Sequence, residues 1–201
     1  YPSPELMEKN GTVIGIPMVL SFWDSLPFWR TFFTSLGFEV CLSDASTRKM
    51  YEEGLSAVTS DTVCFPAKLV HGHLRNLAKH GVDRIFMPSI TTVRTENTEN
   101  TSESMCAVVK GYPIVVRNSD NPEKRFGIPF DAPLFHWYDD KDRLHQLSKY
   151  MEETFHIPAE KTKAAIEAGE QAQDTFRSRL KEAGAAVIKE VQEKGTYAIV
   201  L

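Results

Sequence analysis

Cysteine is scarce in this chain of 201 residues, and long apolar runs are absent. The three cysteines (Cys41, Cys64 and Cys106) cannot build a disulfide framework, and no secretory signal is visible, so we expect a reducing, cytoplasmic setting. No apolar stretch approaches the roughly 20 residues that cross a bilayer, so no membrane partner is expected. A net charge of −4 argues against nucleic acid, because phosphate backbones require a concentrated positive surface.

Several common catalytic motifs are also missing. The chain has no Gly-x-Gly-x-x-Gly, no P-loop, no Gly-x-Ser-x-Gly and no His-Glu-x-x-His. These absences remove dinucleotide-binding, phosphate-loop, serine-hydrolase and zinc-protease signatures from consideration.

The first 90 residues alternate between strand and helix patterns. We expect strands at 12–20, 38–42 and 83–88, and helices at 27–36, 47–53 and 66–80. This alternation is typical of a parallel sheet with right-handed crossovers. The sequence therefore predicts an α/β fold, a Rossmann-like three-layer lobe with a mostly parallel sheet.

The second half is less regular. Residues 89–104 are polar and predict a loop or mobile lid. Two short apolar runs follow at 105–109 and 114–116, interrupted by Gly111 and Pro113, and then an irregular stretch at 118–133. Residues 134–138 fit an edge strand, and residues 140–155 fit a helix.

The ends divide the chain further. We expect a linker at 1–11, the lobe at 12–157, a long helix at 158–195 and the first strand of a further subdomain at 196–201. Because the chain begins with Tyr1 and stops inside a strand pattern, we expect it to be part of a longer polypeptide.

The most informative stretch runs from 60 to 73. Pro66 suits a first helical turn, which places Cys64 at the helix N-terminus, where free N–H groups favour a thiolate. Lys68 and His71 would share its face. The alternative is that Cys64 is a small buried packing residue.

Cys41 and Cys106 differ in context. Cys41 lies inside a strand between Val40 and Leu42, so we expect it in the core. Cys106 follows the polar loop and could face the same crevice as Cys64. Soft metals and iron–sulfur clusters are bound by such thiolates, here two of them with a third ligand from elsewhere in the protein.

The histidines and aromatics have plainer interpretations. His71 and His73 point about 200° apart on a helix, so they predict surface or capping roles and not a shared metal. His80 suits the helix C-terminus. The aromatic side chains at 22–33 predict a core cluster, with a planar ligand as the alternative.

Particular segments resemble a known family. They are Gly15-Ile16-Pro17, Pro27-Phe28-Trp29, Leu36-Gly37-Phe38-Glu39-Val40, Ser60-Asp61-Thr62-Val63-Cys64-Phe65-Pro66-Ala67-Lys68-Leu69-Val70-His71-Gly72-His73, Phe86-Met87-Pro88 and the region of Cys106. Together they resemble the uncharacterised domain attached to CoA-substrate-specific enzyme activases. That domain is related to 2-hydroxyacyl-CoA dehydratase subunits, which have Rossmann-like lobes and hold a [4Fe-4S] cluster through cysteines.

The resemblance implies a ligand set. Cys64 and Cys106 match the family's cysteines, while the position after the Met-Pro turn, usually a third cysteine, is Ser89 here. Serine is a harder iron ligand. The resemblance thus implies a cluster with Ser89 as a ligand, a cluster completed from elsewhere, or a lost site. It further implies that Lys68 and His71 tune the cluster, and that an ATP-dependent activase module, dehydratase subunits or an acyl-CoA are partners.

Three hypotheses follow. The first is an iron–sulfur redox lobe that takes part in electron transfer to, or dehydration of, an acyl-CoA. The second is a non-catalytic structural or partner-docking lobe that has lost its cluster. The third is a thiol enzyme with Cys64 as nucleophile and His71 as base, for which the sequence offers no orienting third group.

Overall fold

The computed structural model describes residues 3–93 and 103–199. Its main sheet contains β1 (Val13–Ile16), β2 (Glu39–Leu42), β3 (Arg84–Phe86) and β5 (Phe130–Asp131) in the order β2-β1-β3-β5. Every neighbouring pair in it is parallel, and β1 pairs with β2 from Val13 opposite Glu39 to Ile16 opposite Leu42. The predicted α/β fold with a mostly parallel sheet is confirmed.

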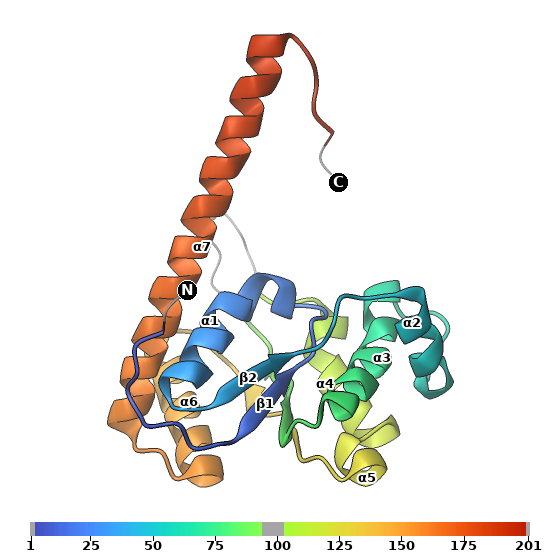
Figure 1. The fold of residues 1–201 in the computed structure, drawn as a ribbon, viewed down its shortest axis with the longest axis vertical. Helices are drawn as coiled ribbons and strands as arrows, with labels where there is room; N and C mark the ends of the chain where they lie inside the picture. Colours follow the sequence, from blue (N-terminus) through green and yellow to red (C-terminus); the bar gives the residue numbers. More distant parts are fainter. Residues whose placement is uncertain (1–2, 94–102, 200–201) are drawn as a thin grey trace.

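Helices cover both faces of this sheet (Figure 1). The helices and the short 3-10 turn are α1 (Phe22–Ser35), α2 (Arg48–Gly54), η1 (Leu55–Ala57), α3 (Phe65–His80), α4 (Ala107–Ser119), α5 (Pro122–Phe126), α6 (Asp140–Phe155) and α7 (Ala159–Lys194). In Figure 1, α1, α6 and α7 gather on one side of the sheet, and α3, α4 and α5 lie on the other. This is the expected three-layer arrangement.

Helix α1 begins five residues earlier than predicted, at Phe22 and not at Pro27. Proline inside a helix lacks an N–H and disturbs the preceding turn. Gln173 of α7 compensates, because its amide donates to the Asp24 carbonyl at 2.8 Å and accepts from the Phe28 N–H at 3.2 Å. A tertiary contact from 145 residues along the chain thus supports the turn around Pro27.

Helix α4 corrects a second prediction. Residues 107–119 form one continuous helix, although Gly111 and Pro113 suggested separate apolar runs. Tyr112 and Val116 are spaced four apart and are buried, so the helical period was present in the sequence but masked by two residues that usually break helices.

The segment predicted as a polar loop and the irregular stretch after it are partly structured. Ser89 and Ile90 form β4, which pairs in parallel with β6 (Leu134–Phe135) in a separate two-stranded sheet. Residues 94–102 of the predicted lid lie outside the described residues. The stretch at 118–133 contains α5 and β5, so it is more regular than expected.

Helix α7 is 36 residues long and lies within the predicted range of 158–195. Its first half packs on α1 and α6, and its second half extends beyond the body of the domain (Figure 1).

Residues 196–199 show no strand, so the strand predicted to start at 196 is not formed there. Within the described ranges, no helix is long and apolar enough to cross a membrane.

The aromatic run of α1 forms the centre of the core, as predicted. The ring centroids of Trp29 and Phe86 on β3 are 4.7 Å apart, and those of Phe33 and Phe86 are 4.9 Å apart. Trp23 is the exception, with 61% of its surface exposed. The run therefore fixes α1 to the sheet.

Candidate functional site

Cys64 and Cys106 occupy equivalent positions on neighbouring helices. Each is the N-cap residue of its helix, Cys64 of α3 and Cys106 of α4, and each is exposed. The predicted position of Cys64 at a helix N-terminus is confirmed, and the alternative of a buried packing residue is wrong.

A pocket of about 310 Å³ lies beside both cysteines. It is lined by Thr59, Ser60, Thr62, Val63, Ala107, Val108, Gly111, Tyr112 and Val115. Val63 directly precedes Cys64, and Ala107 directly follows Cys106. The chain neighbours of both cysteines therefore line one pocket, while the shared crevice of Cys64 and Cys106 themselves stays a prediction. We call this space the cysteine pocket.

The thiols of Cys106 and Cys41 have different electrostatic surroundings. The backbone N–H groups of Val109 and Val108 lower the pKa of the Cys106 thiol, and Lys110 lowers it further. Cys41 is half-buried in β2, where burial and the charges of Asp44 and Glu39 raise its pKa. Cys41 packs against the core as predicted, and Cys106 is disposed to be a thiolate.

Ser89 and Lys68 are engaged with backbone groups. Ser89 is buried, and its hydroxyl donates to the carbonyl of Lys110. Lys68 Nζ donates to the carbonyl of Asp61 at 2.8 Å and so holds the loop before Cys64. Their roles toward a cluster stay predictions.

His71 is fully buried, so the prediction of a surface or capping role is wrong. Its Nδ1 lies 2.8 Å from Oδ2 of Asp120, and its Nε2 lies 3.1 Å from the hydroxyl of Tyr112. Asp120 ends α4, and Tyr112 lies in the middle of that helix. The sequence reasoning failed because it judged His71 from α3 alone, whereas α4 covers this face of α3.

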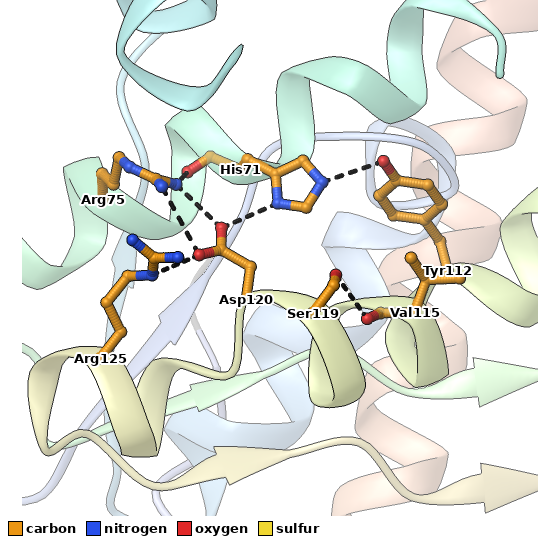
Figure 2. A network of polar contacts seen from close by, with 7 residues as sticks. All are labelled: His71, Arg75, Tyr112, Val115, Ser119, Asp120 and Arg125. Atoms are coloured by element: carbon orange, nitrogen blue, oxygen red, sulfur yellow. Dashed lines mark hydrogen bonds and ion pairs between the residues drawn. The ribbon is translucent and has the colours of Figure 1, made fainter. Parts of the chain in front are cut away.

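Asp120 is held by two arginines in addition to His71. Arg75 Nη1 donates to Oδ2 at 2.9 Å, and Arg125 Nε lies 2.5 Å from Oδ1 (Figure 2). Burial alone would raise the pKa of Asp120, but the hydrogen bonds from His71 and Arg75 outweigh it, and the pKa lies below its ordinary value. Asp120 is therefore a carboxylate at neutral pH.

The ionisation of Asp120 decides the tautomer of His71. A carboxylate only accepts, so Nδ1 of His71 carries a proton and donates it. In the neutral imidazole Nε2 then accepts, and its donor is the Tyr112 hydroxyl. Burial raises the pKa of Tyr112, and the charges of Cys64 and Asp120 raise it further. Tyr112 thus connects a buried ion-pair network to the wall of the cysteine pocket.

The chain matches a family described as the CoA enzyme activase uncharacterised domain over residues 13–201. It belongs to that family. The resemblance noted from the sequence is confirmed. A comparison with curated proteins found no match.

His73 and His80 have structural partners in this activase-associated domain. His73 is fully buried, with Nδ1 2.6 Å from Ser43 Oγ and Nε2 2.9 Å from Ser46 Oγ, so a surface role is wrong for it also. His80 lies in the last turn of α3, as predicted, and is 3.3 Å from Asp44. His73 therefore fastens α3 to the end of β2.

The predicted cluster lacks a complete ligand set in the described part of the activase-associated domain. Across residues 3–93 and 103–199, no three His, Cys, Asp or Glu side chains are grouped as metal ligands. Cys64 and Cys106 offer two exposed thiols at the N-termini of neighbouring helices, but the hydroxyl of Ser89 already has a partner. A cluster here requires at least one ligand from outside these residues.

Sequence reasoning missed Tyr112 and Asp120. Tyr112 stood between two suspected helix breakers, and Asp120 stood in a stretch judged irregular. One signal was available, because Tyr112 lies six residues after Cys106, where a helix that starts at Cys106 brings it into its second turn.

Proposed function

We propose that this activase-associated domain contributes Cys64 and Cys106 as thiolate ligands to an iron–sulfur centre in the cytoplasm. The centre would take part in electron transfer to, or dehydration of, an acyl-CoA. The observation that carries the proposal is the placement of two exposed thiols, each at a helix N-terminus, beside one pocket. When bound, the cluster would supply one-electron chemistry.

The chain's own residues have defined tasks in this proposal. The N–H groups at the start of α4 and Lys110 favour negative charge at Cys106. Lys68 holds the loop that positions Cys64. The remaining ligands come from another part of the protein or from a partner, for which the ATP-dependent activase module and dehydratase subunits are the candidates.

Anaerobic reconstitution of the full-length protein with iron and sulfide tests this function. We expect bound iron and sulfide with charge-transfer absorption in the wild type, and loss of both in Cys64→Ala and Cys106→Ala. Cys41→Ala is the matched control, because it removes a half-buried thiol from β2, a strand that contributes no residue to the pocket. Less than one iron per chain, or equal iron in all three variants, would overturn the proposal.

A second candidate function is a non-catalytic docking lobe. It is favoured by the apolar surface next to Cys64, where Phe65 and Leu55 are exposed and line a shallow pocket of about 630 Å³. Exposed aromatic and aliphatic side chains at a pocket are typical of protein contacts. We propose that the activase module covers this surface.

Binding of the isolated activase module separates the two candidates. Phe65→Ser should weaken binding by tenfold or more if the surface docks the module, with Leu180→Ser on the distal part of α7 as the control for general loss of apolar surface. Iron loading that is unchanged in Phe65→Ser would show that docking and cluster binding are separate properties.

A further inference from the structure

Figure 2 shows the network of Tyr112, His71 and Asp120, and Tyr112 also lines the cysteine pocket. His71 and Asp120 have fully buried side chains, whereas Tyr112 both binds His71 and lines the pocket. A buried histidine held by a carboxylate on one nitrogen and a hydroxyl on the other has the arrangement of a proton relay. The proposed cluster function leaves these three groups without a task.

The hydrogen bonds admit two protonation states. With neutral His71, the Tyr112 proton points to Nε2, and the phenol oxygen offers only lone pairs to the pocket. With protonated His71, Nε2 donates to the phenol oxygen, and the Tyr112 proton is free to point into the pocket. The state of His71 therefore decides whether Tyr112 accepts from or donates to a group in the pocket.

The charges around His71 make this choice sensitive to the pocket. Asp120 supplies one negative charge, while Arg75 and Arg125 supply two positive charges. These groups around His71 therefore carry one net positive charge. Negative charge in the cysteine pocket would act on these groups through Tyr112, which lines the pocket and bonds to His71.

We propose that Tyr112, His71 and Asp120 form a proton relay that takes up a proton when negative charge appears in the cysteine pocket. A water molecule in the pocket protonates the Tyr112 oxygen while the original Tyr112 proton moves to Nε2 of His71. One water O–H bond and one phenolic O–H bond break, one N–H bond and one new phenolic O–H bond form, and the hydroxide left from the water departs to solvent. Asp120 then holds the imidazolium, and Tyr112 donates a hydrogen bond to the charged group.

The inference rests on the proposed function for the source of the charge, since an electron taken up by a cluster that the cysteines hold would add one negative charge. In that setting Tyr112 is the residue that touches the pocket, and His71 and Asp120 are positioning residues. The relay would couple electron arrival to uptake of one proton. Its test, however, needs no metal.

A charge can be placed in the pocket chemically. In a Cys41→Ala, Cys106→Ala background, Cys64 is alkylated either with iodoacetate, which adds a carboxylate, or with iodoacetamide, which adds a neutral group of nearly equal size. The titration of His71 is then followed by NMR of its ring proton, which is assigned with His71→Gln. Circular dichroism confirms that each protein is folded.

We expect the carboxylate adduct to raise the proton affinity of His71 by about threefold to tenfold over the neutral adduct. In Tyr112→Phe, which keeps the ring and loses the hydroxyl, this difference should fall to less than half. Equal titrations for the two adducts, a His71 that does not titrate before unfolding, or a difference unchanged in Tyr112→Phe would each overturn the relay and leave the network a structural one.

The titration experiment and the iron-binding experiment can fail independently of each other. A protein that takes up no iron but shows the charge-dependent titration keeps the relay and loses the proposed function. A protein that binds iron through Cys64 and Cys106 without the titration keeps the function and loses the relay.

Discussion

Nδ1 of His71 lies 2.8 Å from Oδ2 of Asp120, and both side chains are completely shielded from solvent. This contact joins the middle of α3 to the end of α4, the two helices whose N-termini carry the exposed cysteines. The geometry of the cysteine pocket therefore depends on a buried ion-pair network.

Asp120→Asn should destabilise the domain by about 3–5 kcal/mol, because it leaves Arg75 and Arg125 without their shared counter-charge. Urea unfolding at pH 7 measures this loss. Glu52→Gln, which removes an exposed pair with Arg48, is the control and should change stability by less than about 0.5 kcal/mol. Similar effects of the two substitutions would contradict the structural role of Asp120.

Acid should destabilise the domain through His73. Burial lowers the pKa of His73 from 6.5 to about 4. Below pH 6.5 the unfolded chain therefore binds a proton that the folded chain refuses, so stability is complete above that pH and is lost as the pH falls toward 4. The loss attributable to His73 reaches about 3 kcal/mol, from 1.36 kcal/mol per pKa unit.

Urea unfolding between pH 4 and pH 8 measures this dependence. The slope of stability against pH should be shallower in His73→Gln than in the wild type, whatever the absolute stability of the variant. Parallel curves for the two proteins would show that His73 does not cause the acid sensitivity.

Gly72→Ala should disrupt the packing of α3 on α2. A Cβ at residue 72 would lie 2.2 Å from the carbonyl oxygen of Met50, which is backbone and cannot turn aside. We expect a loss of at least about 2 kcal/mol. Gly184→Ala is the matched control, since nothing lies within 4 Å of its Cβ position, and it should stabilise α7 by up to about 1 kcal/mol. Thermal unfolding of both variants makes the comparison.

The three thiols should differ in reactivity. Cys64 and Cys106 are exposed, and the pKa of Cys106 is lowered, whereas Cys41 is half-buried with a raised pKa. Iodoacetamide at pH 7.5 should therefore label both pocket cysteines well before Cys41, as measured by mass spectrometry of the peptides. Labelling of Cys41 before either pocket cysteine would contradict the described environments.

The alternation of strand and helix patterns was sufficient to predict the α/β fold, because hydrophobic period and turn residues act locally. The same local chemistry placed Cys64 at a helix N-terminus through Pro66, and it placed the aromatic run of α1 in the core. The family could also be recognised from these segments.

Contacts between elements far apart in the chain decided the features of the fold and the site that local patterns did not predict. Pro27 lies inside α1 because Gln173 of α7 bonds to both sides of it. His71 is buried because α4 covers it, and α4 itself was hidden by Gly111 and Pro113, whose local preferences are overruled by packing. Sequence alone determined that a helix begins at Cys64 and that strands and helices alternate around a mostly parallel sheet. Only the tertiary structure brought Tyr112 and Asp120 to His71, because burial and hydrogen bonding between helices do not depend on neighbours in the chain.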